Sequence, residues 1–235
     1  MYLYIIRHGE PDYANDSLTA NGKKQAKALA ERLCIHGIDE IYSSPRGRAI
    51  QTALPACELL KLPYAIEDWM NEDALWENLS AVDEHGERDW AFGCQNTKLL
   101  EHDHSNNDWY ANPIFSTCRS ASGGYKHIAD NADDLLARLG YEREGKLYKI
   151  IDPNEKKVAA FCHHGISTVW LSHMLSITPS IFWAGFDIAH SSVTLLVFRN
   201  NPDGYTAPQC MYLSDISHIY KENLPVKAGV DLFTV

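Results

Sequence analysis

Paired cysteines, long apolar runs and clusters of positive charge are all missing from this 235-residue sequence. Its six cysteines are scattered without a C-x-x-C pair, which argues against a disulfide framework. No apolar stretch approaches the length that crosses a bilayer, and the run after Met1 is too short for a signal-peptide core. We therefore expect reduced thiols, a cytoplasmic location and no membrane partner.

Basic residues are outnumbered by acidic ones. The chain has 21 Lys and Arg against 31 Asp and Glu, which gives a net charge of −10. No basic stripe or lysine-rich tail is present, so a nucleic-acid partner is not expected. Any site for an anion must therefore be built locally, from a few converging arginines and backbone N–H groups.

The first ten residues place reactive groups where an α/β fold binds its ligands. Residues 2–6 form an apolar run typical of a buried parallel strand, and it ends at Arg7-His8-Gly9. Ligands of open α/β sheets gather beyond the carboxyl ends of the strands. Arg7 offers a fork of donors suited to phosphate or carboxylate, and His8 offers a nucleophile or a proton carrier. On this tripeptide alone, a cap of a strand at a solvated loop is an equally good interpretation.

The same arrangement recurs twice. Residues 38–42 read as a strand, and hydroxyls and arginines follow in segment 43–48 before a helix over 49–60 with an interruption at Pro55. Such a helix start favours an anion through its free N–H groups and its dipole. Residues 157–162 read as another strand, which ends at a histidine pair and a glycine. A purely structural domain has no need of His and Arg at three strand ends.

The rest of the chain alternates between regular and irregular stretches. The pattern predicts helices over 23–33, with Thr19 as N-cap, and over 120–139 and 167–175; strands over 63–67, 193–198 and 211–214; and a hairpin formed by 147–151 with 157–162. Residues 69–118 show no sustained periodicity and read as an irregular insertion. Such a segment is either a lid or binding loop, or a surface excursion packed by its own aromatic residues.

Four ordered motifs carry a resemblance to a known family. They are Arg7-His8-Gly9-Glu10, Leu18-Thr19-x-x-Gly22-x-x-Gln25-Ala26, Ser43-Ser44-Pro45-x-x-Arg48-Ala49-x-x-Thr52-Ala53 and His163-x-Gly165. Together they closely resemble the histidine phosphatase superfamily, which has the phosphoglycerate-mutase-like fold. The resemblance implies one α/β domain over residues 1–235, a three-layer α/β/α sandwich with a mostly parallel sheet, and the insertion of about 69–118 over the active site.

The resemblance also implies the chemistry of the site. His8 would be the nucleophile that takes the phosphoryl group, and Arg7, Arg48 and His163 would surround the phosphate. Water would then attack the phosphohistidine and release phosphate. No metal or other cofactor is expected, because cationic side chains supply the charge that phosphoryl transfer requires.

Two assignments leave an alternative open. His163 aligns with the second catalytic histidine, and His164 occupies a position where family members usually have glycine; we favour His163. The general acid is normally a glutamate after the third strand, which fits Glu72, while Glu77 stands in a similar pattern five residues later. We favour Glu72, although a solvated carboxylate is the plain alternative for either.

Further residues are assigned to phosphate binding. Asn15 lies one residue beyond the position of an asparagine in the mutases, and Ser44 bonds the phosphate or caps the helix. The run 101–104 contains two histidines but lacks a convincing third ligand, so we expect no metal there.

The motifs lead to a first prediction of function and two alternatives. The first is a phosphomonoester hydrolase acting on a small phosphorylated metabolite. A phosphoglycerate mutase must hold a second anionic group, and the insertion contains only Arg88 and Lys98 as basic residues, so hydrolysis is favoured. The second alternative is a non-catalytic module that binds a phospho-ligand or another protein. The complete set of histidines and arginines counts against it. A homo-oligomer is left open.

Overall fold

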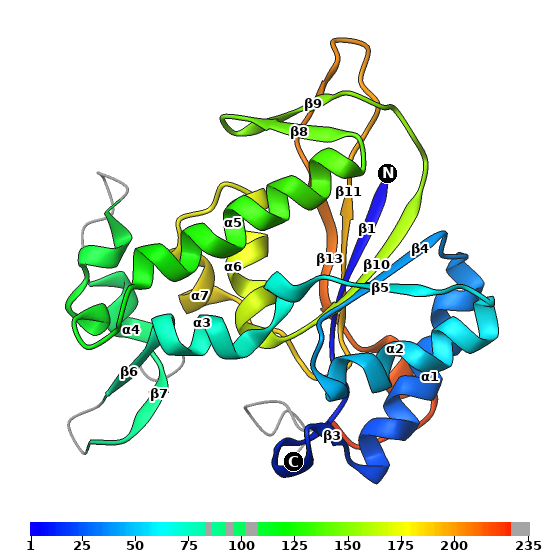
Figure 1. The fold of residues 1–235 in the computed structure, drawn as a ribbon, viewed down its shortest axis with the longest axis horizontal. Helices are drawn as coiled ribbons and strands as arrows, with labels where there is room; N and C mark the ends of the chain where they lie inside the picture. The colour runs from blue at the N-terminus through cyan, green and yellow to red at the C-terminus, as the bar shows by residue number, and fades with distance from the viewer. Residues whose placement is uncertain (83–85, 93–95, 102–107, 227–235) are drawn as a thin grey trace.

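A six-stranded sheet forms the centre of the computed structural model, which describes residues 1–82, 86–92, 96–101 and 108–226 (Figure 1). The strand order is β13-β11-β1-β10-β4-β5. Four strands, β1, β10, β4 and β5, are mutually parallel, and β11 is antiparallel to β1. Their bounds are β1 (Tyr2–Arg7), β4 (Glu40–Ser43), β5 (Tyr64–Ile66), β10 (Lys157–Cys162), β11 (Val193–Val197) and β13 (Gln209–Asp215). The predicted mostly parallel α/β sheet is confirmed.

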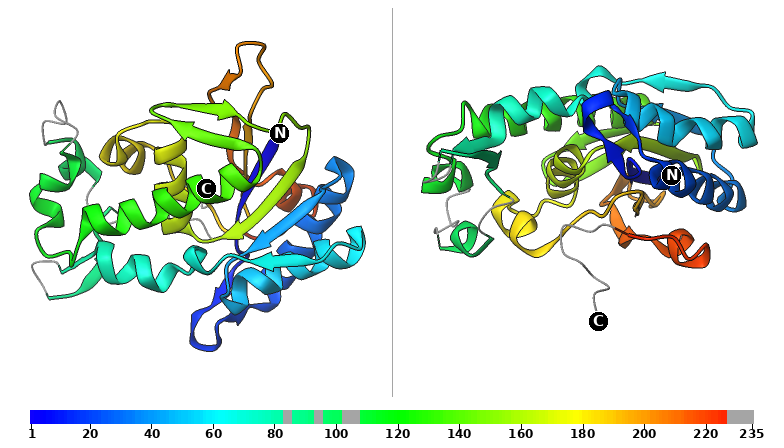
Figure 2. Two further views of the ribbon diagram at one scale, coloured as in Figure 1. Left: turned by 45° about the horizontal axis from the view of Figure 1, so that its top comes forward. Right: turned by 90° about the horizontal axis from the view of Figure 1, so that it is seen from below.

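Helices cover both faces of this sheet (Figures 1 and 2). Leu3 and Ile5 of β1 belong to one core, which they share with side chains of α5 and α6. Tyr4 and Ile6 belong to a second core, shared with α1 and α2. Successive side chains of a strand point to opposite faces, so the alternation in β1 separates the two cores and produces three layers. The four helices are α1 (Ala20–His36), α2 (Gly47–Leu60), α5 (Ala121–Arg138) and α6 (His164–Met174).

Local signals set the ends of the first helix. The Thr19 side chain accepts a hydrogen bond from the N–H of Gly22, as predicted for an N-cap, and Gly37 ends the helix at a φ of 71°. The second helix differs from expectation because it continues through Pro55 to Leu60. Its apolar face is buried on both sides of the proline, and packing of that face outweighs the one lost backbone hydrogen bond.

The predicted hairpin between 147–151 and 157–162 is wrong. The strand β9 (Leu147–Ile150) pairs instead with β8 (Tyr141–Glu144), through a turn that contains Gly145 at a φ of 63°. A turn of two residues suits antiparallel neighbours, whereas the fully buried β10 pairs in parallel with β1 and β4. The short β12 (Tyr205–Thr206) completes this three-stranded sheet.

The insertion is more regular than predicted. It contains short helices and a hairpin, namely η2 (Asp68–Met70), α3 (Glu72–Leu79), β6 (Ser80–Val82), β7 (Arg88–Trp90), α4 (Asn96–Leu100), η3 (Trp109–Ala111) and η4 (Pro113–Phe115). Aromatic rings join it to the helical layer, since Trp109 packs edge-on against Trp183 at 5.1 Å between ring centroids. The remaining elements are β2 (Pro11–Asp12), η1 (Tyr13–Asn15), β3 (Ser17–Leu18), α7 (Pro179–Gly185) and α8 (Ser217–Lys221). In the part of the chain that the structure describes, no helix combines the length and apolarity needed to cross a bilayer.

Strand register brings the predicted reactive residues to one edge of the sheet. Arg7, the last residue of β1, is paired with Cys162, the last of β10. On the other side of β10, Phe161 is paired with Ser43 at the end of β4. The residues that follow these strand ends therefore emerge side by side.

Candidate active site

His8 is held in one tautomer, which leaves a lone pair on its other ring nitrogen. The ring is buried, and Nδ1 lies 2.7 Å from the carbonyl oxygen of Gly9, so this nitrogen carries the proton. Burial, together with the nearby His163 and Arg7, holds the pKa of His8 well below its ordinary value. The ring is therefore neutral at pH 7. Its Nε2 is buried without a hydrogen-bond partner among the described residues, and it keeps the lone pair that a nucleophile needs.

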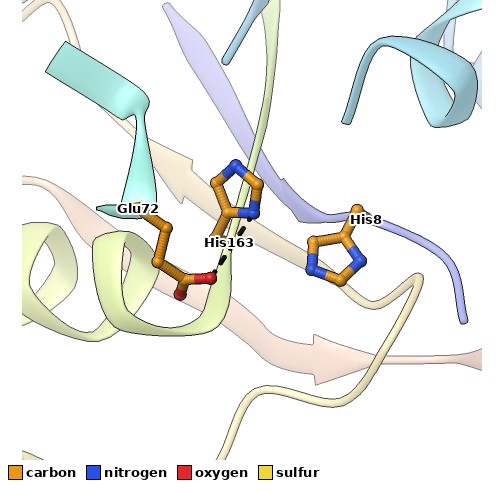
Figure 3. Close-up of side chains that lie close together, drawn as sticks. All are labelled: His8, Glu72 and His163. Atoms are coloured by element: carbon orange, nitrogen blue, oxygen red, sulfur yellow. Dashed lines mark ion pairs between the residues drawn. The ribbon is translucent and has the colours of Figure 1, made fainter. Parts of the chain in front are cut away.

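His163 faces His8 from the end of β10 (Figure 3). The two ring centroids are 5.1 Å apart, and His163 is completely buried. Its Nε2 lies 2.7 Å from Oγ of Ser44, which fixes the ring, while its Nδ1 has no hydrogen-bond partner among the described residues. Burial and the charges of Arg48 and Arg7 lower the pKa of His163 well below its ordinary value. Ser44 thus orients a histidine here, and its Oγ also accepts a hydrogen bond from the N–H of Arg46 at 3.3 Å, directly before α2.

Glu72 reaches the same place from the first turn of α3. One carboxylate oxygen, Oε1, accepts a hydrogen bond from the N–H of Gly165 at 2.8 Å, and Oε2 lies 3.6 Å from Nδ1 of His163. Glu77, the alternative, has a half-exposed side chain that pairs with Arg88 at 3.4 Å. The structure therefore brings Glu72 into the group around His8 (Figure 3), whereas Glu77 contacts Arg88.

Arg7 lies beside His8, and none of its described hydrogen bonds is to a carboxylate. It donates to the carbonyl oxygen of Ile188, and its other terminal nitrogen lies 2.8 Å from Nε2 of His190. The His190 ring also lies close to His8, tilted by 41° at 5.4 Å between ring centroids. This guanidinium makes no direct ion pair with the described residues, so its charge can act on an anion beside His8; it also helps to lower the pKa of Asp187.

Arg48 is buried at the start of α2 and is held by two acids. It donates to Oδ1 of Asp16 at 2.8 Å and lies 3.4 Å from Oε2 of Glu72, with its guanidinium over the ring of Tyr13. Asp16 also accepts from the N–H of Gly47 at 2.8 Å. No motif in the sequence marks Asp16 or Tyr13, so their contacts with Arg48 went unpredicted.

Asn15 is the one predicted site residue that the structure does not bring to this group. Its side chain is exposed and donates to Asp12 at 2.8 Å. The neighbouring Asp16, in a left-handed conformation at a φ of 45°, takes the place beside Arg48 instead. A one-residue shift along a short 3₁₀ turn points a side chain in a different direction, which explains the difference.

His164 lies at the rim of the site. Its Nε2 is 2.8 Å from Oδ1 of Asp187, and its ring stacks on Phe92 of the insertion at 5.9 Å between centroids. The hydrogen bond to His164 is the largest of the effects that lower the pKa of Asp187 to about 2. The structure therefore separates the two histidines, with His163 facing His8 and His164 facing the insertion.

Three side chains in the group have the chemistry to hold either a metal ion or a phosphoryl group. The ligand atoms of His8, Glu72 and His163 lie within 4.8 Å of one another. Two guanidinium groups, from Arg7 and Arg48, accompany them and would repel a divalent cation. The same charges attract an anion, so the set fits a phosphoryl group better than a metal. Residues 102–104, part of the run in which no metal is expected from the sequence, lie outside the described residues.

Arg48→Lys is expected to lower kcat/KM by about a hundredfold, because a lysine keeps the charge but loses the planar fork of donors. The control is Arg46→Lys. Arg46 also pairs with Asp16, but it is one-third exposed and its other acid partner is Asp73. We expect the control to change kcat/KM less than threefold, as measured by initial rates at several substrate concentrations. Equal losses in the two variants would contradict a specific role for Arg48.

His218 supports the backbone of His8 from behind. The N–H of Ser191 donates to the carbonyl oxygen of His8 at 2.9 Å, and Oγ of Ser191 lies 3.1 Å from Nε2 of His218. Burial, and then the charge of Arg32, lowers the pKa of His218 from 6.5 to about 4. The folded protein therefore keeps this ring neutral at pH values where the unfolded chain protonates it.

His218→Gln is expected to flatten the pH dependence of stability. In the wild type, this group's contribution is complete above pH 6.5 and is lost as the pH falls toward about 4. The lost contribution is about 1.4 kcal/mol of unfolding free energy per pH unit. Urea denaturation at intervals between pH 7 and pH 4.5 measures both slopes. A variant with the wild-type slope would show that His218 does not titrate as described.

Residues 3–99 match the family model of the histidine phosphatase superfamily (branch 1). Over 88 residues the chain is 34% identical to phosphoserine phosphatase 1 of Hydrogenobacter thermophilus, covering 33% of this chain and 42% of the relative. Over 115 residues it is 27% identical to a probable phosphoglycerate mutase of Serratia proteamaculans, covering 42% and 54%. The chain thus spans about half the length of the curated relatives it matches.

The similarity of fold to a solved structure extends over nearly the whole of both chains. The mutant phosphoserine phosphatase from Entamoeba histolytica, solved in complex with phosphoserine, superposes with a TM-score of 0.63 at 21% identity. The match covers 93% of this chain and 98% of that one. The match to the family model confirms the resemblance to the histidine phosphatase superfamily that the motifs predicted. The superposition confirms the predicted phosphoglycerate-mutase-like fold.

Proposed function

We propose that this chain is a phosphomonoester hydrolase that acts on a small phosphorylated metabolite through a phosphohistidine on His8. The observation that carries the proposal is a set of four buried nitrogens that make no hydrogen bond to the described residues: Nε of Arg7, Nε2 of His8, Nε of Arg48 and Nδ1 of His163. Unsatisfied buried polar atoms are costly, and their concentration in one group of side chains indicates a missing polar ligand. A phosphoryl group, with its several acceptor oxygens, would satisfy the donors among them.

The first proposed step transfers the phosphoryl group to His8. The lone pair on Nε2 of His8 attacks phosphorus, the P–N bond forms and the bond from phosphorus to the leaving oxygen breaks. The charge on the equatorial oxygens is stabilised by Arg7, Arg48 and His163. Glu72 protonates the leaving oxygen, so the substrate leaves as an alcohol.

The second step regenerates the site. Glu72, now a carboxylate, accepts a proton from a water molecule whose oxygen attacks phosphorus. The P–N bond breaks, its electron pair returns to Nε2 of His8, and inorganic phosphate is released. No cofactor enters either step.

Hydrolysis is favoured over mutase chemistry by the charges around the site. Arg46 and Arg48 already pair with acids, Arg46 with Asp16 and Asp73, and Arg48 with Asp16 and Glu72. Arg7 is left to balance one phosphoryl group. A bisphosphate would need a further unpaired cation, and the carboxylate of Asp187 near the rim would repel its second anionic group.

The first assay is hydrolysis of p-nitrophenyl phosphate in the presence of EDTA. We expect saturable phosphate release that EDTA does not reduce. A panel led by phosphoserine and 3-phosphoglycerate would then rank natural leaving groups. Interconversion of 3- and 2-phosphoglycerate faster than phosphate release would establish the mutase alternative, and absence of both activities in folded protein would favour the binding module.

A cytoplasmic location remains part of the proposal. The described cysteines are all free thiols, which fits a reducing compartment. Fractionation of cells that express the full protein would test it.

A further inference from the structure

A cavity lies at the far end of α6 from the catalytic side chains. Its volume is about 540 Å³, and its lining includes Trp109, Tyr125, Arg143, Lys146, His173 and Thr178. Nine residues separate His173 from His164 in α6, a distance of about 14 Å along the helix axis. Figure 1 shows the β8–β9 hairpin, which contributes Arg143 and Lys146, beside the N-terminal end of β1, whereas His8 follows its C-terminal end.

The lining of this cavity is basic, although the chain as a whole is acidic. Arg143 and Lys146 contribute positive charge, and no Asp or Glu is among the lining residues that the structure describes. The whole chain carries a net charge of −10. A cavity with two cations and no acid therefore departs from the average surface and favours a negatively charged ligand.

Arg143 is positioned by neutral groups. One terminal nitrogen donates to the hydroxyl of Tyr148 at 2.8 Å, and the other donates to Oγ of Ser176 at 3.1 Å. The guanidinium also lies over the ring of Tyr148, 5.1 Å from its centroid. A guanidinium has five N–H donors, so several remain for a ligand. Carboxylate and phosphate oxygens match their planar arrangement.

Asp133, an acid close to the cavity, is held by other partners. Asp133 accepts from the hydroxyl of Tyr148 at 3.1 Å through one oxygen, and its other oxygen lies 2.8 Å from Nε2 of His173. It therefore fixes two side chains around the cavity and leaves the charge of Arg143 unpaired by a direct ion pair. Such supporting contacts hold polar groups in position before a ligand arrives.

Aromatic rings form the other part of the lining. Trp109 and Tyr125 lie 5.4 Å apart between ring centroids, and Tyr125 meets His173 edge-on at 6.1 Å. Small-molecule sites combine apolar and aromatic walls with a few converging polar groups, and their volumes are about 300–1,000 Å³. This cavity has both features and falls within that range.

We propose that this cavity, called the Arg143 pocket from here on, binds a small organic anion in addition to the substrate of the catalytic site. Arg143 and Lys146 would hold its carboxylate or phosphate group. Trp109 and Tyr125 would pack against its planar or apolar body. The proposal is independent of the chemistry at His8.

The test is NMR titration of the full chain with benzoate and with phenylphosphonate, neither of which is a phosphomonoester. The readout is the indole N–H signal of Trp109, assigned by its loss in Trp109→Phe. We expect this signal to shift and saturate with at least one probe, and the probe that binds more tightly identifies the preferred anion. Benzylamine, which has the same ring and the opposite charge, should produce no saturable shift.

Two variants decide whether the basic groups are responsible. Arg143→Gln should weaken binding at least tenfold, as expected for loss of hydrogen bonds to a charged group. Lys146→Gln, at an exposed turn residue, should weaken probe binding severalfold. This variant tests the role of the basic groups if Arg143→Gln fails to fold. The control is Lys149→Gln, an exposed cation on β9 outside the lining, which should bind as the wild type does. No saturable shift in the wild type, or wild-type affinity in both pocket variants, would overturn the proposal.

Discussion

His8→Ala is expected to lower kcat for p-nitrophenyl phosphate by at least about a thousandfold, because it removes the atom that forms the bond to phosphorus. In the folded protein, Nε2 of His8 has no described hydrogen-bond partner, and Nδ1 bonds only to the adjacent Gly9 carbonyl. The substitution removes one local hydrogen bond and the packing of one buried ring, so the unfolding free energy should fall by about 1–3 kcal/mol. Initial rates and urea denaturation of the same preparation measure both quantities.

The matched control for His8→Ala is His164→Ala. Its imidazole is also close to the site, but it bonds Asp187 and stacks on Phe92 at the rim. We expect a loss of less than tenfold. If His8→Ala retained wild-type turnover, or if His164→Ala lost as much, the assignment of the nucleophile would be wrong.

Glu72→Gln is expected to have the second largest effect, and its size should depend on the leaving group. An alkyl phosphate such as phosphoserine releases a poor leaving group that needs a proton, so its turnover should fall about 10²- to 10³-fold. The phenolate of p-nitrophenyl phosphate leaves without a proton, and its first step should change much less. A glutamine keeps the acceptor oxygen for the N–H of Gly165, which now meets Glu72 at 2.8 Å, so the local structure should persist.

Glu77→Gln is the control for this prediction. The two glutamates lie in the same helix, but Glu77 pairs with Arg88 near the surface. Turnover of both substrates should stay within about threefold of the wild type. A leaving-group effect in Glu77→Gln and none in Glu72→Gln would reverse our assignment of the acid.

The residues at strand ends were predictable from the sequence because their position depends on local signals. Each apolar run ends at a polar residue. Parallel pairing of the strands then places the residues that follow their carboxyl ends at one edge of the sheet. The pairing of Arg7 with Cys162 shows the result, since His8 and His163 follow directly. The lowered pKa of both histidines has burial as its main cause, and the sequence does not report burial residue by residue.

Other features depend on contacts that no local pattern encodes. Asp16 reaches Arg48 because a left-handed residue turns the chain there, whereas the sequence favoured Asn15. The partner of β9 is chosen by a glycine turn on its other side, so the apolar run of β10 misled the hairpin prediction. The regular α3 went unnoticed because its periodicity is short, although the Asn71 side chain caps its start.

The most direct test of the central claim is rapid acid-free quenching of the enzyme during turnover of p-nitrophenyl phosphate, followed by mass spectrometry of the peptide that contains His8. Phosphohistidine is a phosphoramidate, so the adduct should survive base and be lost in acid. We predict one phosphoryl group on His8 that builds up within the first turnover and is absent from His8→Ala. Turnover without any phosphorylated peptide, or a phosphoryl group on His163 instead, would contradict the proposed mechanism.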